Sequence, residues 1–275
     1  MTILKQLFSA IAAVAASNLP LFADAPPPFF FEVTPEVRST YQSLGKIVED
    51  RPMQITSVRF GYDAGAFGRF GIRNWDVSSL TDRRHDVHRH TLYHTEFGPT
   101  WQFDLKFCDE WRLASDLTRS WTMYRGFADD SGNKTYHWYQ LDQSLENPYL
   151  VPFYRLRRCF RGNDYFYFKA GVRKKFALAE SFYVTPSVFA EGGSSRNNKR
   201  VLGAKPNEGR WGAGVSSVSL RLELGWRITA WLTAFAYVEQ YEVVGGEARR
   251  ANKASGYLCA HNDWTHGGVG LRLRF

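Results

Sequence analysis

The last seven residues of the chain constrain its fold more than any other segment. Apolar side chains alternate there with arginines and a glycine, in the order Val269, Gly270, Leu271, Arg272, Leu273, Arg274 and Phe275. A period of two is typical of a β-strand whose two faces meet different surroundings, because successive side chains point to opposite sides. The pattern therefore predicts a strand with one apolar and one polar face at the end of this sequence.

Similar alternating segments, separated by turn-rich stretches, recur along the rest of the chain. We find twelve candidate strands, at 30–44, 53–62, 66–77, 90–107, 111–124, 135–145, 149–157, 164–175, 181–190, 210–228, 231–241 and 262–275. In the third of these, the apolar face changes phase between Ile72 and Trp75. A change of phase within one strand predicts a β-bulge, because an extra residue shifts the side-chain alternation.

The connections between these strands alternate between short and long. The short ones fall at 63–65, 108–110, 146–148, 176–180 and 229–230, and the long ones at 45–52, 78–89, 125–134, 158–163, 191–209 and 242–261. Membrane-spanning barrels have short turns on one side and long loops on the other, and in bacterial single chains the strand number is even. A soluble β-sandwich has no reason to show this alternation. The sequence therefore predicts an all-β fold, a single antiparallel barrel.

The first 25 residues are organised like a secretory signal peptide. Lys5 precedes a short apolar run at 7–16, and the small residues Ala23 and Ala25 follow it. The run is too short for a helix that spans a membrane, which needs ~20 apolar residues. We expect a signal peptide at 1–25, with its cleavage site left open, and a folded domain at 26–275.

A strand that ends on Phe275, behind such a leader, resembles the Gram-negative outer-membrane β-barrel proteins of porin-like type. The resemblance implies a single transmembrane β-barrel of about 12 strands, with 10 or 14 as alternatives, in the cell outer membrane. It also implies contact with outer-membrane lipid and lipopolysaccharide, and recognition of Phe275 by the barrel-assembly machinery. It indicates neither a subfamily nor an oligomeric state.

Several predicted strands have two distinct faces. In 97–107 and 220–228, aromatic and aliphatic residues occupy one face and charged or small residues the other. In 111–123, Arg119 falls on the apolar face, where a lipid-facing arginine would cost ~2–4 kcal/mol at the bilayer midplane. We therefore expect Arg119 near the outer rim, with its head group extended towards water. Aromatic residues near strand ends are expected in the interfacial girdles: Tyr41, Trp75, Trp111, Trp121, Trp138, Trp211, Trp231 and Trp264.

Alternation places charged side chains of both signs, with arginine in excess, on the lumen side. The candidate pore-lining residues are Glu36, Arg38, Arg59, Arg69, Asp104, Lys106, Arg112, Asp116, Lys169, Arg173, Arg221, Glu223, Arg227, Arg272 and Arg274. Rings of charged side chains select ions, so the set could form a constriction with a weak preference for anions. It could equally form a salt-bridge network that fills the lumen.

The chain has a formal net charge of +8, and nearly all of the excess lies in the predicted long loops. Such loops could concentrate anionic solutes at the mouth, or they could contact lipopolysaccharide phosphates. We do not expect nucleic acid as a partner, because secretion removes it.

Histidines gather in 85–94, where His88, His90 and His94 share one strand face and are weak candidates for metal ligands. With Asp86 they could instead serve general acid–base chemistry at the rim. Cys159 and Cys259 both fall in predicted outer loops and are a candidate disulfide, if their Cα atoms come within ~7 Å. No cofactor is predicted.

Three functions are compatible with this sequence. The favoured one is a narrow porin-like channel for small solutes with a mild anion preference. The alternatives are a non-conducting structural or surface-interaction barrel, and an outer-membrane hydrolase with a histidine-rich rim site. The fold does not separate them, because function depends on the site that a barrel carries.

Overall fold

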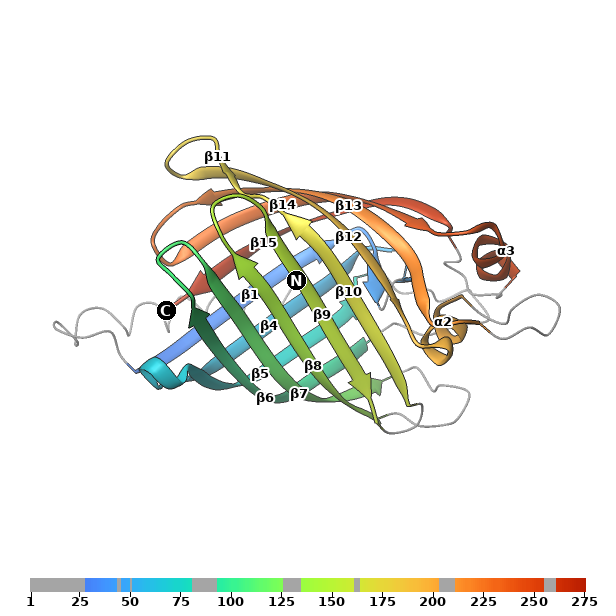
Figure 1. The fold of residues 1–275 in the computed structure, drawn as a ribbon, viewed down its shortest axis with the longest axis horizontal. Helices are drawn as coiled ribbons and strands as arrows, with labels where there is room; N and C mark the ends of the chain where they lie inside the picture. Colours follow the sequence, from blue (N-terminus) through green and yellow to red (C-terminus); the bar gives the residue numbers. More distant parts are fainter. Residues whose placement is uncertain are drawn as a thin grey trace.

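The computed structural model describes residues 28–43, 46–49, 51–80, 93–125, 135–160, 164–202, 211–254 and 261–275. Twelve strands form a closed antiparallel barrel (Figure 1). They are β1 (Phe29–Arg38), β4 (Met53–Asp63), β5 (Arg69–Ser79), β6 (Tyr93–Lys106), β7 (Arg112–Arg125), β8 (Thr135–Glu146), β9 (Val151–Cys159), β10 (Tyr165–Arg173), β12 (Phe182–Gly193), β13 (Gly214–Arg227), β14 (Leu232–Val243) and β15 (Asp263–Arg274). The prediction of twelve barrel strands is confirmed.

The ring closes because every barrel strand has a neighbour on both sides. β1 pairs with β15 through Glu36 and Gly270, which confirms that the first and last strands meet. β10 pairs with β12 through Lys169 and Glu191, and the two-residue strand β11 (Phe176–Ala177) lies beside β12 as an extra edge. Closure leaves no unpaired edge, which is a requirement for a sheet surrounded by lipid.

The strands are staggered, so that a row of paired residues climbs around the wall. One such row runs through Tyr62, Phe70, Trp101, Leu117, Leu141, Leu156, Phe168 and Gly192. It begins beside a short turn at one end of the barrel and finishes beside helix α2 at the other. Tilted and staggered strands are what closing a sheet into a barrel requires.

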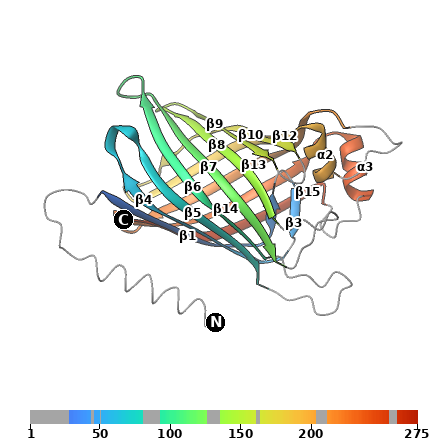
Figure 2. The ribbon, with the colours of Figure 1, turned by 90° about the horizontal axis from the view of Figure 1, so that it is seen from below.

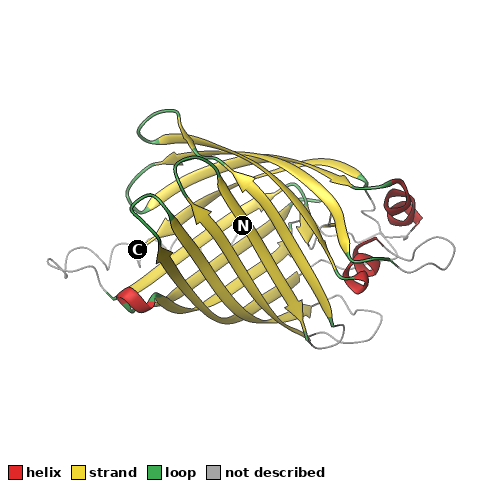
Figure 3. Cartoon of the chain, viewed as in Figure 1, coloured by secondary structure: helices red, strands yellow, loops and turns green. Residues whose placement is uncertain are grey.

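The two ends of the barrel differ in their connections (Figures 2 and 3). The periplasmic end carries tight turns, including the 3-10 turn η1 (Gly65–Phe67) between β4 and β5. The extracellular end carries two helices, α2 (Ser195–Leu202) and α3 (Gly246–Ala254), and a small hairpin of β2 (Tyr41–Ser43) and β3 (Lys46–Glu49). The predicted alternation of short turns and long loops is therefore confirmed.

The outer wall of the barrel is largely apolar. Its exposed large side chains include Phe60, Phe70, Ile72, Phe97, Trp101, Leu105, Leu220, Leu222, Leu224, Trp226, Val238 and Val269. So large an apolar surface is unusual for a protein in water and is the band that a transmembrane barrel presents to lipid. Separately, none of the described helices has the length and hydropathy needed to cross a bilayer.

The structure corrects the sequence-based assignment at several places, including Trp211 and Trp264, which pack against the inner cluster of Tyr241 and Val243. β5 pairs with β4 from Arg69 to Ser79 without a register shift, so the bulge predicted near Ile72 is wrong. Trp75 consequently points inward and packs against Met53, Ile55 and Val77 instead of joining a girdle. Trp138 is also inside, and β1 ends at Arg38 because the chain turns there into the β2–β3 hairpin.

Candidate functional site

The periplasmic half of the barrel interior contains a polar cavity of about 680 Å³. Its charged lining comes from seven strands or turns: Asp63, Arg69, Asp104, Asp116, Asp142, Arg155, Lys169 and Arg173. A second cavity of about 230 Å³ lies next to it and shares Asp116, Asp142 and Arg155. The two spaces together form a polar compartment inside the wall.

Two short ion pairs hold the sides of this compartment. Arg59 on β4 reaches across the interior to Asp116 on β7, with Nη2 and Oδ2 2.6 Å apart. The alternation of β4 explains its direction, because Val58 and Phe60 on either side of Arg59 belong to the outer wall. On neighbouring strands, Arg155 Nε lies 2.6 Å from Asp142 Oδ1. Both arginines are thereby neutralised by a carboxylate.

Arg73 on β5 differs from these two arginines. It lines the smaller cavity together with Arg59 and Arg155. Among the described residues, no carboxylate oxygen lies within 4.0 Å of its guanidinium group. The lining of the smaller cavity holds three arginines and three carboxylates, Glu32, Asp116 and Asp142, and Glu32 also lies 3.8 Å from Arg59. Arg73 is the cation of this set that remains available to an anion in the cavity.

A second ionic group lies on the opposite wall. Glu223 accepts from Arg221 at 2.9 Å and from Arg272 at 2.8 Å, and Arg221 also faces Glu239 at 3.8 Å. Arg272 donates to the hydroxyl of Tyr183 as well. Two arginines and two carboxylates therefore face one another on this wall.

The remaining predicted pore-lining residues are spread along the barrel. Arg38 pairs with Glu36 at 2.6 Å in the extracellular half, and Arg69 pairs with Glu32 at 3.2 Å. Near the periplasmic rim, ion pairs join Arg112 to Asp104, Arg173 to Glu146 and Arg274 to Glu32. Lys106 and Arg227 are exposed at that same rim. The predicted residues thus form several small ionic groups at different heights of the barrel, and Glu32 is shared by Arg59, Arg69 and Arg274.

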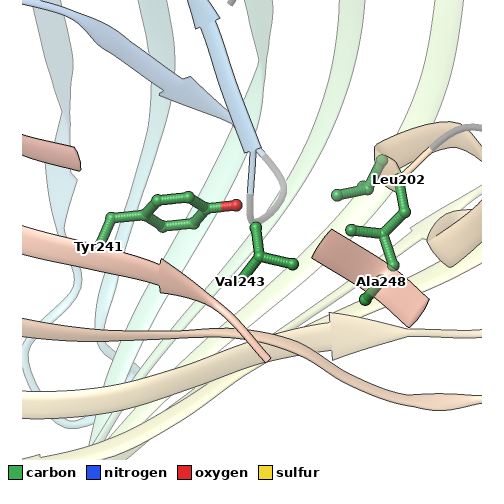
Figure 4. Close-up of a cluster of buried hydrophobic side chains, with 5 residues drawn as sticks. Leu202, Tyr241, Val243 and Ala248 are labelled. Atoms are coloured by element: carbon green, nitrogen blue, oxygen red, sulfur yellow. The ribbon is translucent and has the colours of Figure 1, made fainter. Parts of the chain in front are cut away.

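The extracellular half of the interior contains three clusters of buried apolar side chains, among buried polar ones such as Glu96, Gln140 and Glu191. Tyr136, Trp138, Cys159 and Tyr165 form one buried cluster, and Met53, Ile55 and Val77 form another. A third joins Tyr241 and Val243 of β14 to Leu202 of α2 and Ala248 of α3 (Figure 4). The helices are therefore packed onto the inner wall at the mouth.

The β2–β3 hairpin is also fastened inside this mouth. The side-chain amide of Gln42 donates to Glu191 Oε2 at 2.7 Å, and its carbonyl oxygen lies 3.2 Å from His266 Nε2. Glu191 in turn accepts from the hydroxyl of Tyr167 at 2.6 Å. Gln42 thus connects the hairpin to β12 and β15 across the opening.

Several sequence-predicted residues lie outside the described part of the chain or have no test there. His88, His90 and Cys259 are outside the described residues, so the metal, rim-site and disulfide hypotheses remain predictions. His94 is buried and lies against the Trp75 ring, with centroids 5.1 Å apart. The described residues contain no group of three or more side chains arranged to hold a metal ion.

The sequence analysis missed residues that turn out to be central. Arg73, Asp142 and Arg155 line the cavities, and Arg157 pairs with Glu96 across the interior at 3.5 Å. An unbroken alternation from Arg69 to Ser79 would have placed Arg73 inside. The expectation of an outward Trp75 concealed that signal.

Comparisons with solved structures find outer-membrane β-barrel proteins among the similar chains. The KdgM porin in complex with disordered oligogalacturonate is 11% identical, with 90% of this chain and 99% of that chain covered and a TM-score of 0.47. The NanC porin is 10% identical, with coverages of 88% and 98% and a TM-score of 0.46. The translocator domain of autotransporter NalP from Neisseria meningitidis is 10% identical, with coverages of 98% and 95% and a TM-score of 0.45.

At these identities the likeness concerns the barrel architecture alone. A scan against protein-family models finds no match, and a search of curated proteins finds none either.

Proposed function

We propose that this protein is a narrow outer-membrane channel for small solutes, with a mild preference for anions. The observation that carries the proposal is the central set of Arg59, Arg73 and Arg155, in which Arg73 has no carboxylate partner among the described residues. A guanidinium group in a polar space with low-dielectric walls attracts anions more strongly than it would in open water. Anions would therefore enter this part of the lumen more readily than cations.

The lining of the cavities also supports passage of hydrated solutes. Charged and hydroxyl groups surround the smaller cavity, including Thr34, Ser57 and Glu32, and these can replace part of a hydration shell. A lumen filled by side chains, as in eight-stranded barrels, would leave no comparable space. Twelve strands with a polar compartment inside are compatible with a narrow path.

The test is single-channel recording of the refolded full-length protein in a planar bilayer under a salt gradient. We expect discrete conductance steps and a reversal potential of the sign that indicates anion selectivity. Arg73→Gln should reduce the anion-to-cation permeability ratio severalfold, because it removes a positive charge that has no described carboxylate oxygen within 4.0 Å. Arg158→Gln is the matched control, since it removes one positive charge from the outer face. Equal ratios in the wild type and Arg73→Gln would contradict the assignment of Arg73.

The apolar mouth favours a second candidate, a barrel that does not conduct until its extracellular end opens. Trp138 and Met53 are almost completely buried there, and Gln42 fastens the hairpin across the opening. A wild-type protein that folds but shows no steps, combined with steps in a Gln42→Ala variant, would support this closed state. A silent variant would favour a purely structural barrel.

A further inference from the structure

The outer wall of β7, β8 and β9 carries cationic residues where the rest of the barrel exterior is mostly apolar. Arg119 on β7 and Arg158 on β9 are both exposed, and Tyr139 on β8 lies between them. Neither arginine belongs to the lumen, so the proposed channel does not use them. A charged side chain on a lipid-facing surface is unfavourable unless water or an opposite charge meets it.

The direction of both side chains follows from their neighbours. Thr118 and Ser120, on either side of Arg119, are buried in the interior, whereas Leu117 and Met123 share its face and are exposed. On β9, Arg157 turns inward to Glu96, so Arg158 turns outward, and 59% of its side chain is exposed. Both guanidinium groups therefore leave the barrel on its outer side.

Aromatic rings surround these arginines. The Arg119 guanidinium carbon lies 5.0 Å from the centre of the Trp121 ring and 5.6 Å from that of Tyr139. The Arg158 guanidinium carbon lies 4.9 Å from the Phe160 ring, which itself packs edge-on against Tyr139. Cation–π contacts of this kind hold a guanidinium group in place without neutralising its charge.

His137 completes the patch. It shares the outer face of β8 with Tyr139 and is paired in register with Trp121, whose ring centre is 6.4 Å away. We call the surface formed by Arg119, Trp121, His137, Tyr139 and Arg158 the cationic wall patch. It combines positive charge with the two aromatic residue types that prefer the membrane–water interface.

The stagger of the sheet places this patch in the extracellular half of the membrane band. One paired row runs through Leu117, Leu141 and Leu156. Two residues further along each strand, away from the periplasmic end, lies the row of Arg119, Tyr139 and Arg158. With strands ~4.8 Å apart and tilted by ~40°, Arg119 lies about 14 Å and Arg158 about 20 Å above Tyr62, in an apolar band ~25 Å tall. The Arg119 side chain leans towards Trp121, further along β7 in the extracellular direction. Its charge therefore approaches the outer interface, as expected for a snorkelling side chain.

Nothing in the described protein neutralises Arg119. No described carboxylate oxygen lies within 4.0 Å of its guanidinium group, and Arg158 has only Asp164, at 3.6 Å and largely exposed. Charges of one sign at the lipid boundary are costly unless an opposite charge or water meets them. A negatively charged group from outside the protein would satisfy both arginines.

We propose that the cationic wall patch binds the phosphate-bearing headgroup of an outer-leaflet lipid. The planar guanidinium group presents paired N–H donors that match phosphate oxygens, whereas an ammonium group offers only a point charge. Arg119 and Arg158 stand two strands apart, about 10 Å at the backbone, and their long side chains can converge on one headgroup. Tyr139 lies between them in the sheet, and its hydroxyl can donate to the same phosphate or to a sugar.

The test is native mass spectrometry of the full-length protein, refolded in a mild detergent and mixed with lipid A or phosphatidylglycerol. We expect the wild type to retain one lipid A molecule, and Arg119→Gln/Arg158→Gln to lower the bound fraction about tenfold. The control Arg112→Gln, which removes a periplasmic arginine, should bind as the wild type does. Arg119→Lys/Arg158→Lys keeps the charge but loses the paired donors, and should bind with intermediate affinity.

Several outcomes would overturn the proposal. Equal binding by the wild type and the double glutamine variant would remove the patch from the site. Displacement of the lipid by millimolar inorganic phosphate would show a site for a free anion instead. A dimer that dissociates in the variant, with lipid retention unchanged, would show that a second copy of the chain covers the patch. Unchanged heat-modifiable gel mobility confirms that each variant is folded, and Arg158→Gln alone serves if the double variant is not.

Discussion

The two halves of the barrel interior are held together by different kinds of interaction. At the extracellular end, Trp138, Tyr136 and Tyr165 are buried in one apolar cluster. In the periplasmic half, ion pairs such as Arg59–Asp116 border open polar cavities. We therefore expect the apolar packing of the mouth and the charge around the periplasmic cavities to depend on different residues. Opening the channel and changing its ion preference should therefore be separable by mutation.

The sharpest test of this contrast is Trp138→Ala at the mouth. Trp138 is 2% exposed, and its ring N–H donates to Thr122 Oγ1 at 2.7 Å. Truncating a buried tryptophan typically lowers the free energy of unfolding by ~3–5 kcal/mol, since it leaves a cavity. Urea unfolding in detergent, followed by tryptophan fluorescence, measures the loss. Trp226→Ala on the outer wall is the matched control and should cost less, because Trp226 is 46% exposed. Equal losses would mean that the mouth is no better packed than the wall.

The candidate disulfide between Cys159 and Cys259 would strengthen the same end. Cys159 is buried in the cluster with Trp138, and Cys259 lies outside the described residues. If the bond forms, reduction should lower the free energy of unfolding by ~2–4 kcal/mol. Peptide mapping with and without reductant checks the connectivity. Alkylation of both cysteines in the folded, unreduced protein would disprove the bond.

In the periplasmic half, Asp116→Asn should have a smaller effect on stability and a clear effect on ions. Arg59 and Asp116 are 12% and 21% exposed, so the variant leaves a largely buried guanidinium group without its nearest carboxylate, with only Glu32 remaining at 3.8 Å. We expect a loss of about 1–3 kcal/mol in the free energy of unfolding. The permeability ratio should move towards anions, opposite to the change in Arg73→Gln. A shift towards cations in bilayer recordings would refute the electrostatic account of the lumen.

The smallest effect is expected at the periplasmic rim. Arg112 and Asp104 are 3.1 Å apart but 49% and 45% exposed. Arg112→Gln should change the free energy of unfolding by less than ~1 kcal/mol, because water and salt screen exposed ion pairs. The reversal potential should remain close to that of the wild type. A large shift would place the selective constriction at the rim instead of around Arg73.

Much of this architecture could be predicted from the alternation of side chains. Strands such as β13 show it plainly, with Leu220, Leu222 and Leu224 outside and Arg221 inside. The rule behind the prediction was that apolar faces meet lipid, and it holds wherever the lumen is polar. Around Met53, Ile55 and Val77 the interior is itself apolar, so the same rule assigns Trp75 to the wrong face. The expected change of phase between Ile72 and Trp75 also hides the inward direction of Arg73, because it interrupts the alternation that begins at Arg69.

The helices and the hairpin at the mouth could not be predicted in the same way. α2 and α3 are short and bury small or polar residues such as Ala251 and Asn252, without a long apolar stripe. Gln42 shows no sign in the sequence that it will meet Glu191, which lies far along the chain. Contacts of this kind depend on which loops the closed ring brings together, and local alternation carries no information about that.

The pairing of β1 with β15 has a consequence for how the protein forms. The residues that must meet, such as Val33 and Leu273, stand at opposite ends of the barrel sequence. Phe275 takes part in this seam, stacking on Trp231 and exchanging backbone hydrogen bonds with Phe31. Until that strand has been made, the other eleven can only form an open sheet with two unsatisfied edges. The barrel can therefore close only after its last strand has been made. Until then, the strand edges of the growing chain must be kept from lipid and from other chains.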